Sequence, residues 1–566
     1  MLLLKSKKNY GHLLIFAAVA TSLVIAPYFS YEAVNPPKLL ILATFGFAFG
    51  GLIIYTLSDN LAGNLKTTTI FALLFLVILI TTWVLSPGNP VAKFYGINGR
   101  HTGVLTYLSL LFIFLLAAMV SDLNFLRLVV KGITLTGLVS IFYAVLQILD
   151  LDPFPWQNNE TWVQTFFANP NFFAAFLSFS AVPTVAYILF GEKNKKTISA
   201  ALVYLATSLF ILKQTLTYQG FFALTLTSGV IFSIWIIKRW HSIYLKISIF
   251  LIFVLAVVGI ILDLFQKAPW VSIFYKASLS TRGDYWRSAW QIFLDHPFVG
   301  VGLDQFRNYY ERYRDVPAAQ NREGALLGDA VHNVFLDILV GGGILLLLSY
   351  LALLVLCAVS IARYIQRTEK ISFYYISVLG IFMAYLTQSV ISINHLGLAI
   401  WGWLSAGALI GFEISTRDLL PSKNSKVEIA HKTSRQRAIR KRGGVSHVMT
   451  SCLGALLGFI VSVPVIKVNH EIVVAYKESS PVLLYQAANK SPKDTWRMSS
   501  TAETLRNMGY SQDAYLLVQE AIKFDPESVI PWKVLNDFPN LPSDIRTQVE
   551  KKILQLDPLN ELTPSP

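Results

Sequence analysis

An arginine and a histidine frame a long polar loop between two strongly apolar stretches of this chain. Arg282 stands early in STRGDYWRSAW, and His332 stands at the edge of the apolar stretch that follows. A neutral imidazole can take a proton from a hydroxyl near pH 7, and a guanidinium presents a fork of donors that matches phosphate oxygens. Polar residues at a membrane surface often mark the place where chemistry meets a lipid-borne substrate. The two residues therefore predict a general base and a phosphate contact.

Simpler roles would also explain these side chains. His332 would then be an interfacial histidine at the start of a helix, hydrogen-bonded to water or to Asn333, and Arg282 would reach toward lipid headgroups. Arg287 lies about one helical turn after Arg282 and is a weaker candidate for the same phosphate contact. His296 is expected to have a structural role.

The loop also predicts local structure. After Arg282, residues of one helix face recur at offsets of 4, 7, 8 and 11, namely Trp286, Ala289, Trp290 and Phe293. Tryptophans on an apolar face favour the membrane interface, so we expect a helix that lies flat on the membrane. HPFVGVG follows at 296–302, and its glycines permit a tight turn.

Three other segments place polar residues at the edges of apolar stretches. Arg100 lies shortly before such a stretch, within YGINGRHTG. Asn169 and Asn171 flank Pro170 at the start of another, where asparagine can cap a helix that has proline in its first turn. Gln219 stands at a turn between two further apolar stretches. We treat Arg100 as a second phosphate or glycan contact, with an interfacial anchor as its alternative.

The elements that must position these residues are membrane spans. The chain has 566 residues, of which 54% are hydrophobic, and a mean hydropathy of +0.53. Because a span needs ~20 apolar residues, the pattern predicts about thirteen spans. They cover 11–30, 37–57, 68–86, 102–120, 124–149, 168–190, 197–214, 220–237, 247–265, 333–362, 372–393, 397–414 and 447–467. The first is expected to be a retained span rather than a cleaved signal peptide, since no small-residue cleavage site follows it.

The basic residues orient these spans. With a cytoplasmic N-terminus, the inner loops hold Lys66, Arg127, Lys193, Lys195, Lys196, Lys238, Arg239, Arg363, Arg367 and Lys370. The last inner loop, 416–446, holds nine Lys or Arg against two acids. This agrees with the positive-inside rule and places the loop 266–331 outside. We therefore attribute the net charge of +14 to the orientation of the spans and to contact with lipid, and not to nucleic-acid binding.

The chain divides into a membrane core, 1–467, and a polar C-terminal part, 468–566. The sequence of the C-terminal part predicts helices with a repeat of the tetratricopeptide type. The residues that form this pattern are Ala502, Leu505, Gly509, Ala514, Ala521 and Pro526. Thirteen spans put this domain outside the cytoplasm, where it would bind a protein or merely cap the core. Cys357 and Cys452 lie in apolar stretches and are expected to be buried packing residues rather than a disulfide.

The order of these motifs resembles a known family. Arg282-x3-Trp286, then HP-x2-G-x-G, then His332-Asn333 before a glycine-rich apolar stretch is similar to the signature loop of the O-antigen ligase and polymerase superfamily of bacterial membrane glycosyltransferases. The resemblance covers most of residues 85–410 and is strongest over 280–345. The glycine-flanked Arg100 and the Asn-Pro-Asn at 169–171 are similar to two further elements of that family.

The chain departs from the family pattern in two loops. Many relatives carry an arginine just before the Asn-Pro-Asn element, where this chain reads VQTF at 163–166. Relatives often have Ser-Arg-Gly where this chain reads YQG at 218–220. The missing cations put direct charge contacts from both loops in doubt, and a contact by Gln219 would be a neutral hydrogen bond.

The resemblance implies an all-α, multi-pass enzyme of the cytoplasmic membrane. It would transfer a glycan from a polyprenyl-diphosphate donor, such as undecaprenyl diphosphate, to an acceptor hydroxyl on the outer face, with inversion and with no metal or cofactor. His332 would be the base, and Arg282 and Arg100 would hold the diphosphate. The remaining candidate substrate contacts are Arg287, Trp286, Asn333, Asn169, Asn171 and Gln219.

Several alternatives stay open. Within the superfamily the acceptor could be a lipid core, a growing polymer or a protein, and the C-terminal repeats lean toward a protein acceptor or partner. A transporter or flippase is the runner-up of another class, although no pair of Gly/Pro-broken spans suggests inverted repeats. A repeat-domain scaffold would leave the Arg–His loop unexplained. The chain carries no GxxxxGK[ST], HExxH or paired-Asp sugar-nucleotide motif.

Overall fold

The computed structural model describes residues 2–154, 156, 163–192, 194–240, 277–320, 328–417, 444–539 and 541–562, with isolated positions between 242 and 251. Every regular element in these ranges is a helix. The helices of the core are α1 (Leu2–Leu23), α2 (Asn35–Ala62), α3 (Lys66–Leu85), α4 (Pro90–Tyr95), α5 (Val104–Val120), α6 (Leu123–Ile148), η1 (Thr165–Phe167), α7 (Pro170–Phe190), α8 (Lys195–Gln214), α9 (Gln219–Arg239), α12 (Ala277–Asp295), α13 (Phe306–Tyr313), α14 (Val316–Gln320), α16 (Val334–Arg367), α17 (Phe373–Ile391) and α18 (Leu396–Arg417). They are followed by α20 (Gly444–Lys477), α21 (Pro481–Ala488), α22 (Thr495–Asn507), α23 (Ser511–Phe524), α24 (Val529–Asn536), α25 (Ser543–Leu556) and η2 (Asn560–Leu562).

The predicted multi-pass helical fold is confirmed. In the described part of the chain, ten helices are long and apolar enough to cross a membrane, and Asn9–Leu23 and Val104–Val120 are shorter apolar helices. Together they correspond to twelve of the predicted spans. The remaining one, 247–265, lies almost entirely outside the described residues.

Glycines allow the helices of the bundle to approach closely. A Cβ atom on Gly407 or Gly411 of α18 would lie 2.1 Å from a backbone carbonyl oxygen of α5. A Cβ on Gly454 of α20 would lie equally close to the carbonyl oxygen of Phe47 in α2. Small residues four apart are the usual device for close helix packing in lipid, where apolar burial alone does not drive association. These contacts fix α5, α18, α2 and α20 as neighbours.

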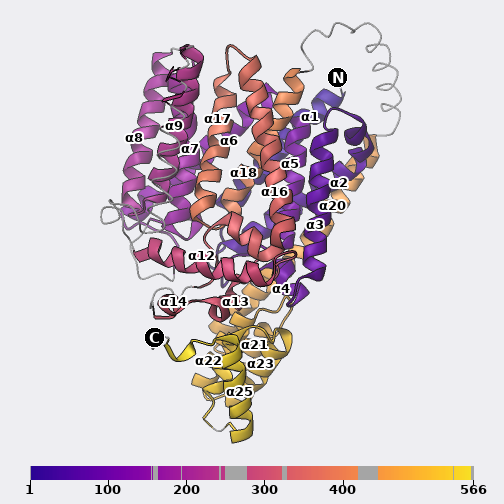
Figure 1. The fold of residues 1–566 in the computed structure, drawn as a ribbon, viewed down its shortest axis with the longest axis vertical. Coiled ribbons are helices and arrows are strands. Elements are labelled where there is room, and N and C mark those ends of the chain that lie inside the picture. The colour runs from indigo at the N-terminus through magenta and orange to yellow at the C-terminus, as the bar shows by residue number, and fades with distance from the viewer. Residues whose placement is uncertain are drawn as a thin grey trace.

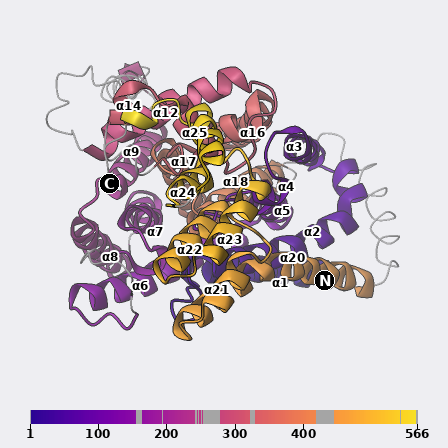
Figure 2. The same ribbon diagram turned by 90° about the horizontal axis from the view of Figure 1, so that it is seen from below.

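The two ends of the bundle differ. α4, α12, α13 and α14 lie at the same end as α21–α25 (Figures 1 and 2), which we call the loop end. At the opposite end the Lys238 ammonium donates to the backbone oxygens of Ile365 and Thr368, the latter at 2.9 Å. There Arg367 also pairs with Glu413 at 2.8 Å. We call this the basic end.

The C-terminal part is helical, as predicted. α22 and α23 form a pair joined at Gly509, whose φ of +92° suits glycine. The small residues of the predicted repeat are fully buried between the helices of this part, as Ala502, Ala514 and Ala521 have no exposed surface. Membership of these helices in the tetratricopeptide family stays a prediction.

One sequence-based expectation needs correction. Cys357 is buried, but Cys452 is exposed on α20, so it is not a core packing residue. α12 is helical, as predicted, and lies across the loop end, and it buries Tyr285, Ser288, Ala289 and Ile292. Trp290 is 47% exposed, and its contact with the membrane interface stays a prediction.

Candidate active site

A carboxylate lies between two of the predicted site residues, Arg100 and His332. Asp329 forms an ion pair with Arg100 through Oδ2, and its Oδ1 lies 3.8 Å from Nε2 of His332. A second arginine, Arg307 of α13, lies 4.0 Å from the same carboxylate. The loop 96–103 and the start of α16, far apart in the chain, therefore meet at the loop end.

The His332 ring is held by α12. Tyr285 stacks on it with ring centroids 5.7 Å apart and an interplanar angle of 19°. The indole N–H of Trp286 donates to the backbone oxygen of Val331 at 3.1 Å. His332 itself has a φ of +54°, a strained conformation for a residue with a side chain. Such strain persists only where the surroundings enforce it, and it is typical of functional sites.

The backbone after His332 begins a helix that breaks early. Asn333 caps α16 by accepting from the N–H groups of Phe335 and Leu336 at 3.0 and 3.1 Å. At Gly343 the backbone leaves the helical conformation, with a φ of +66°. The predicted long span 333–362 is therefore a short helix, Val334 to Gly342, followed by a longer one.

The turn at 296–302 hydrogen-bonds to the backbone of α16 at this break. The N–H groups of Val301 and Gly302 donate to the carbonyls of Val340 and Gly341, both at 2.9 Å. The N–H of Ile344 donates to the carbonyl of Pro297 at 2.8 Å. The backbone groups that the break leaves without helical partners are thus hydrogen-bonded, as buried backbone groups must be. The turn fixes the direction in which the short helix presents His332.

The Arg100 loop is organised by a second carboxylate. Oδ2 of Asp304 accepts from the backbone N–H groups of Ile97 and Thr102 at 2.9 and 3.0 Å. Gly96, with a φ of +77°, is required because a Cβ there would lie 2.3 Å from that oxygen. The glycines around Arg100 therefore let the loop close around Asp304.

Electrostatics favour a neutral base beside an ionised acid. Burial lowers the pKa of His332, the Asp329 carboxylate opposes this, and the charges of Arg100 and Arg282 lower it further. Burial raises the pKa of Asp329, but Arg100 and His332 more than offset it and hold this pKa well below its usual range. At neutral pH the imidazole is ready to accept a proton, and the carboxylate can stabilise the resulting imidazolium.

Arg282 lies close enough for its charge to act on His332. Burial lowers the pKa of Arg282, with the ring of Tyr285 as the opposing influence. Among the residues that the structure describes, no carboxylate pairs with it. A half-buried guanidinium that no carboxylate in the described ranges pairs with suits an anionic ligand.

Other predicted contacts have protein partners. Arg287 pairs with Asp284 at 2.8 Å and with Asp315 at 2.6 Å, so its guanidinium ties α12 to the segment before α14. Asn169 caps α7 by accepting from the N–H of Asn171 at 2.8 Å, with Pro170 in the first turn, which confirms the predicted capping role.

The remaining predicted contacts lie at the starts of α7 and α9. Gln219 donates to Gln388 at 3.4 Å inside the bundle. Within the described ranges, no hydrogen bond or ion pair joins Asn169, Asn171 or Gln219 to the Arg100–Asp329–His332 cluster. The structure thus brings together Arg100, Arg282, Trp286, His332 and Asn333, and leaves these three outside the cluster.

Sequence reasoning did not find every member of the cluster. Asp304, Arg307 and Tyr285 carried no recognised signal, because only the folded loop brings them to Arg100 and His332. Asp329 could have been found, since it precedes His332 by three residues and a carboxylate at that spacing can reach an imidazole.

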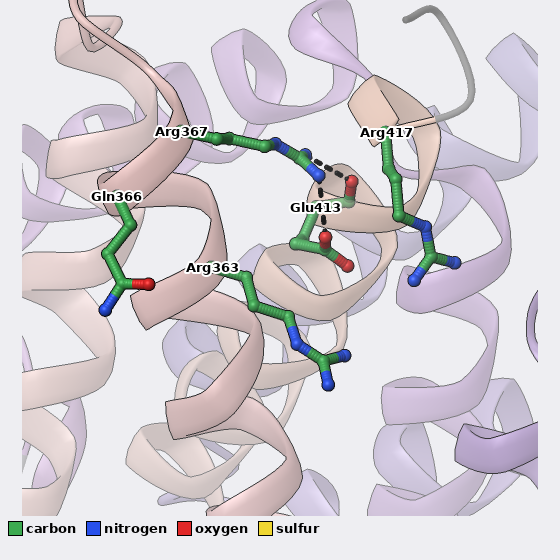
Figure 3. Close-up of a pocket in the computed structure, with 5 residues that line it drawn as sticks. All are labelled: Arg363, Gln366, Arg367, Glu413 and Arg417. Atoms are coloured by element: carbon green, nitrogen blue, oxygen red, sulfur yellow. Dashed lines mark hydrogen bonds and ion pairs between the residues drawn. The ribbon is translucent and has the colours of Figure 1, made fainter. Parts of the chain in front are cut away.

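A cavity also lies at the other end of the bundle. It has a volume of about 630 Å³ at the basic end and is lined by Arg363, Gln366, Arg367, Glu413 and Arg417 (Figure 3). Arg367 points to Glu413 and donates to it, whereas the Arg363 and Arg417 guanidiniums extend into the open space. Because this cavity lies at the other end of α16 from His332, its size does not identify it as the active site. Among the described residues, no group of three His, Cys, Asp or Glu side chains is placed to hold a metal ion.

The part of the chain that contains Asp329 and His332 also matches a protein-family model. Residues 200–351 match the model of the O-antigen ligase family. The match includes Arg282, Asp329 and His332 and ends inside α16. No curated protein matches the chain. The family match supports the resemblance to the O-antigen ligase superfamily, and with it a multi-pass membrane enzyme of the glycan-transferring kind.

Proposed function

We propose that this protein is a membrane glycosyltransferase that moves a glycan from a polyprenyl-diphosphate donor to an acceptor hydroxyl. One observation carries the proposal most: Asp329 joins Arg100 to His332 at one end of a membrane bundle, beside Arg282, which pairs with no carboxylate among the described residues. A base and a set of cations are what displacement of a diphosphate requires. The family match over 200–351 supports the same reaction class.

The proposed mechanism is a single displacement. The acceptor oxygen attacks the anomeric carbon and gives its proton to His332. The bond from that carbon to the phosphate oxygen breaks, and its electron pair leaves with the diphosphate. Asp329 faces Nε2 of His332, so Nε2 carries the hydrogen and Nδ1 accepts the proton. Attack from the side opposite the leaving group inverts the anomeric carbon.

The arginines act on the diphosphate. Arg282 has no carboxylate partner in the described part of the chain, so it can give its full donor fork to phosphate oxygens. Arg100 is shared with Asp329 and would contact the leaving charge with its remaining donors. No step needs a metal ion or cofactor, because fixed guanidiniums can stabilise the charge that develops on the diphosphate.

The proposed location is the outer face of the cytoplasmic membrane. The basic end carries Lys238, Arg363, Arg367 and Arg417, the charge pattern of a cytoplasmic side. The loop end and the C-terminal helices would then be extracytoplasmic. Reporter fusions at Gly324 and Glu561 should both be exported, and one at Lys370 should be cytoplasmic. An internal reading at Gly324 would reverse the orientation.

The candidate acceptors are a lipid core, a polysaccharide repeat and a protein hydroxyl. The C-terminal helices lie at the same end as α12, whose Tyr285 stacks on His332, and this placement supports a protein acceptor as the second candidate (Figures 1 and 2).

The test is a transfer assay on purified protein in detergent with a polyprenyl-diphosphate-linked oligosaccharide, EDTA and each acceptor class in turn. We expect product with one acceptor class and release of polyprenyl diphosphate. Absence of product with all three classes would argue for a transporter or scaffold, and loss of activity on adding EDTA would overturn the metal-free mechanism.

A further inference from the structure

The Arg100 loop is held from two sides. On one side Asp304 accepts from Ile97 and Thr102, as described above. On the other side, Asp494 from the C-terminal helices accepts from the backbone N–H of Asn98 through Oδ2 at 3.1 Å. Its other oxygen, Oδ1, caps α22 by accepting from the N–H of Arg497 at 2.8 Å. One carboxylate therefore connects the start of α22 to the loop that carries Arg100.

The segment before the loop has a similar bridge. Asn89 caps α4 with its side-chain oxygen, which accepts from the N–H of Val91 at 2.9 Å. Its amide nitrogen donates to the carbonyl of Phe524, at the end of α23, at 2.9 Å. Both ends of the α4–loop segment are thus joined to the C-terminal helices.

The C-terminal helices are themselves docked firmly on the loop end. Arg314 donates to both oxygens of Asp557 at 2.7 and 2.8 Å, and the two side chains are only 1% and 0% exposed. Lys533 reaches the same carboxylate at 2.7 Å. Arg312 pairs with Glu527 at 2.6 Å. A buried ion pair with further hydrogen bonds is costly to separate, so these helices form a fixed support.

We propose that Asp494 is a positioning residue for Arg100, so that the C-terminal helices are part of the active-site architecture. This inference rests on the proposed function for its effect on transfer, but the loop geometry can be tested without it. Asp494 would set the depth at which the Arg100 guanidinium meets Asp329 and the donor diphosphate. Loss of the contact would free one side of the loop while Asp304 still holds the other.

The test uses Asp494→Asn. Asparagine caps helices about as well as aspartate, so Oδ1 can keep the cap on α22. Its amide group replaces the oxygen that accepts from Asn98, so only the bridge is lost. We expect transfer to fall about tenfold, the size of one lost charged hydrogen bond. In an Arg100→Ala background, Asp494→Asn should cause no further loss.

Hydrogen exchange provides a readout that is independent of activity. In Asp494→Asn the amide of Asn98 should exchange about tenfold faster than in the wild type, while the helix amides of α22 remain protected. Glu503→Gln, an exposed acid on the same helix, is the matched control and should change neither quantity. Unchanged exchange at Asn98 would overturn the proposal whether or not the protein transfers glycan. Multiplicative losses in the double variant would overturn the link to Arg100.

Discussion

The two ends of the bundle both concentrate arginine, and they use it differently. At the loop end Arg100 is only 13% exposed and paired with Asp329, which also faces His332. At the basic end Arg363 and Arg417 are exposed at the rim of an open cavity, and Arg367 is paired with Glu413 (Figure 3). None of the five residues that line that cavity is a histidine.

The difference teaches that positive charge alone does not mark the active site. Arginines at the cytoplasmic ends of spans are expected from membrane insertion and need no ligand. A buried arginine is held in place by its partners, and its charge interactions are less screened by water. Chemistry is therefore expected where cations, a carboxylate and an imidazole are buried together.

The largest expected effect is that of His332→Ala. A general base typically contributes about a hundred- to ten-thousand-fold, so transfer should fall by at least a hundredfold. Donor binding should persist, because the arginines remain. Single-turnover transfer and donor affinity should be measured together. Near-normal turnover would place the base elsewhere, and His296→Ala, which acts only on the turn, should be milder.

The pH dependence of transfer tests the electrostatics of the loop end. The base must be neutral, and burial together with Arg100 and Arg282 lowers the pKa of His332. The acid limb of kcat/KM should therefore lie below pH 6.5, the unperturbed histidine value. Asp329→Asn removes the carboxylate that opposes this shift, so the limb should move to still lower pH while transfer falls about tenfold. A limb that moved upward would contradict the assigned contact.

A smaller effect is expected at the break in α16. Gly343→Ala would place a Cβ 2.3 Å from the backbone of Phe298 at a positive φ, and should destabilise the protein by about 1–3 kcal/mol. Gly229→Ala in α9 is the control, because a Cβ there meets nothing within 4 Å. Thermal unfolding in detergent compares the two. Equal melting temperatures would mean that the break at Gly343 is not required.

Much of the fold was predictable because membrane spans are local features. Runs of about twenty apolar residues, flanking charges and the cap at Asn169 are all read from neighbouring residues. The gathering of polar residues at one end followed from the alternation of the spans. Arg100 and His332 meet at one carboxylate, Asp329, and their roles as phosphate contact and base stay predictions.

The rest depends on contacts between distant segments. The ion pair of Arg100 with Asp329 needs the loop 96–103 to meet the start of α16, and no periodicity encodes that meeting. The break at Gly343 is stable only because the turn at 296–302 supplies its hydrogen bonds. The contact of Asp494 with Asn98 joins two parts that looked like separate domains in the sequence.

The most direct test replaces arginine by lysine once at the loop end and once at the basic end of the bundle. Arg282→Lys and Arg363→Lys each keep the positive charge and remove the guanidinium fork. Transfer rates of the two variants should be compared in one assay at matched expression. The account predicts that Arg282→Lys loses about a hundredfold, as expected for a donor to developing charge, while Arg363→Lys keeps the wild-type rate. Equal rates in the two variants, or a loss confined to Arg363→Lys, would contradict the assignment of the loop end as the active site.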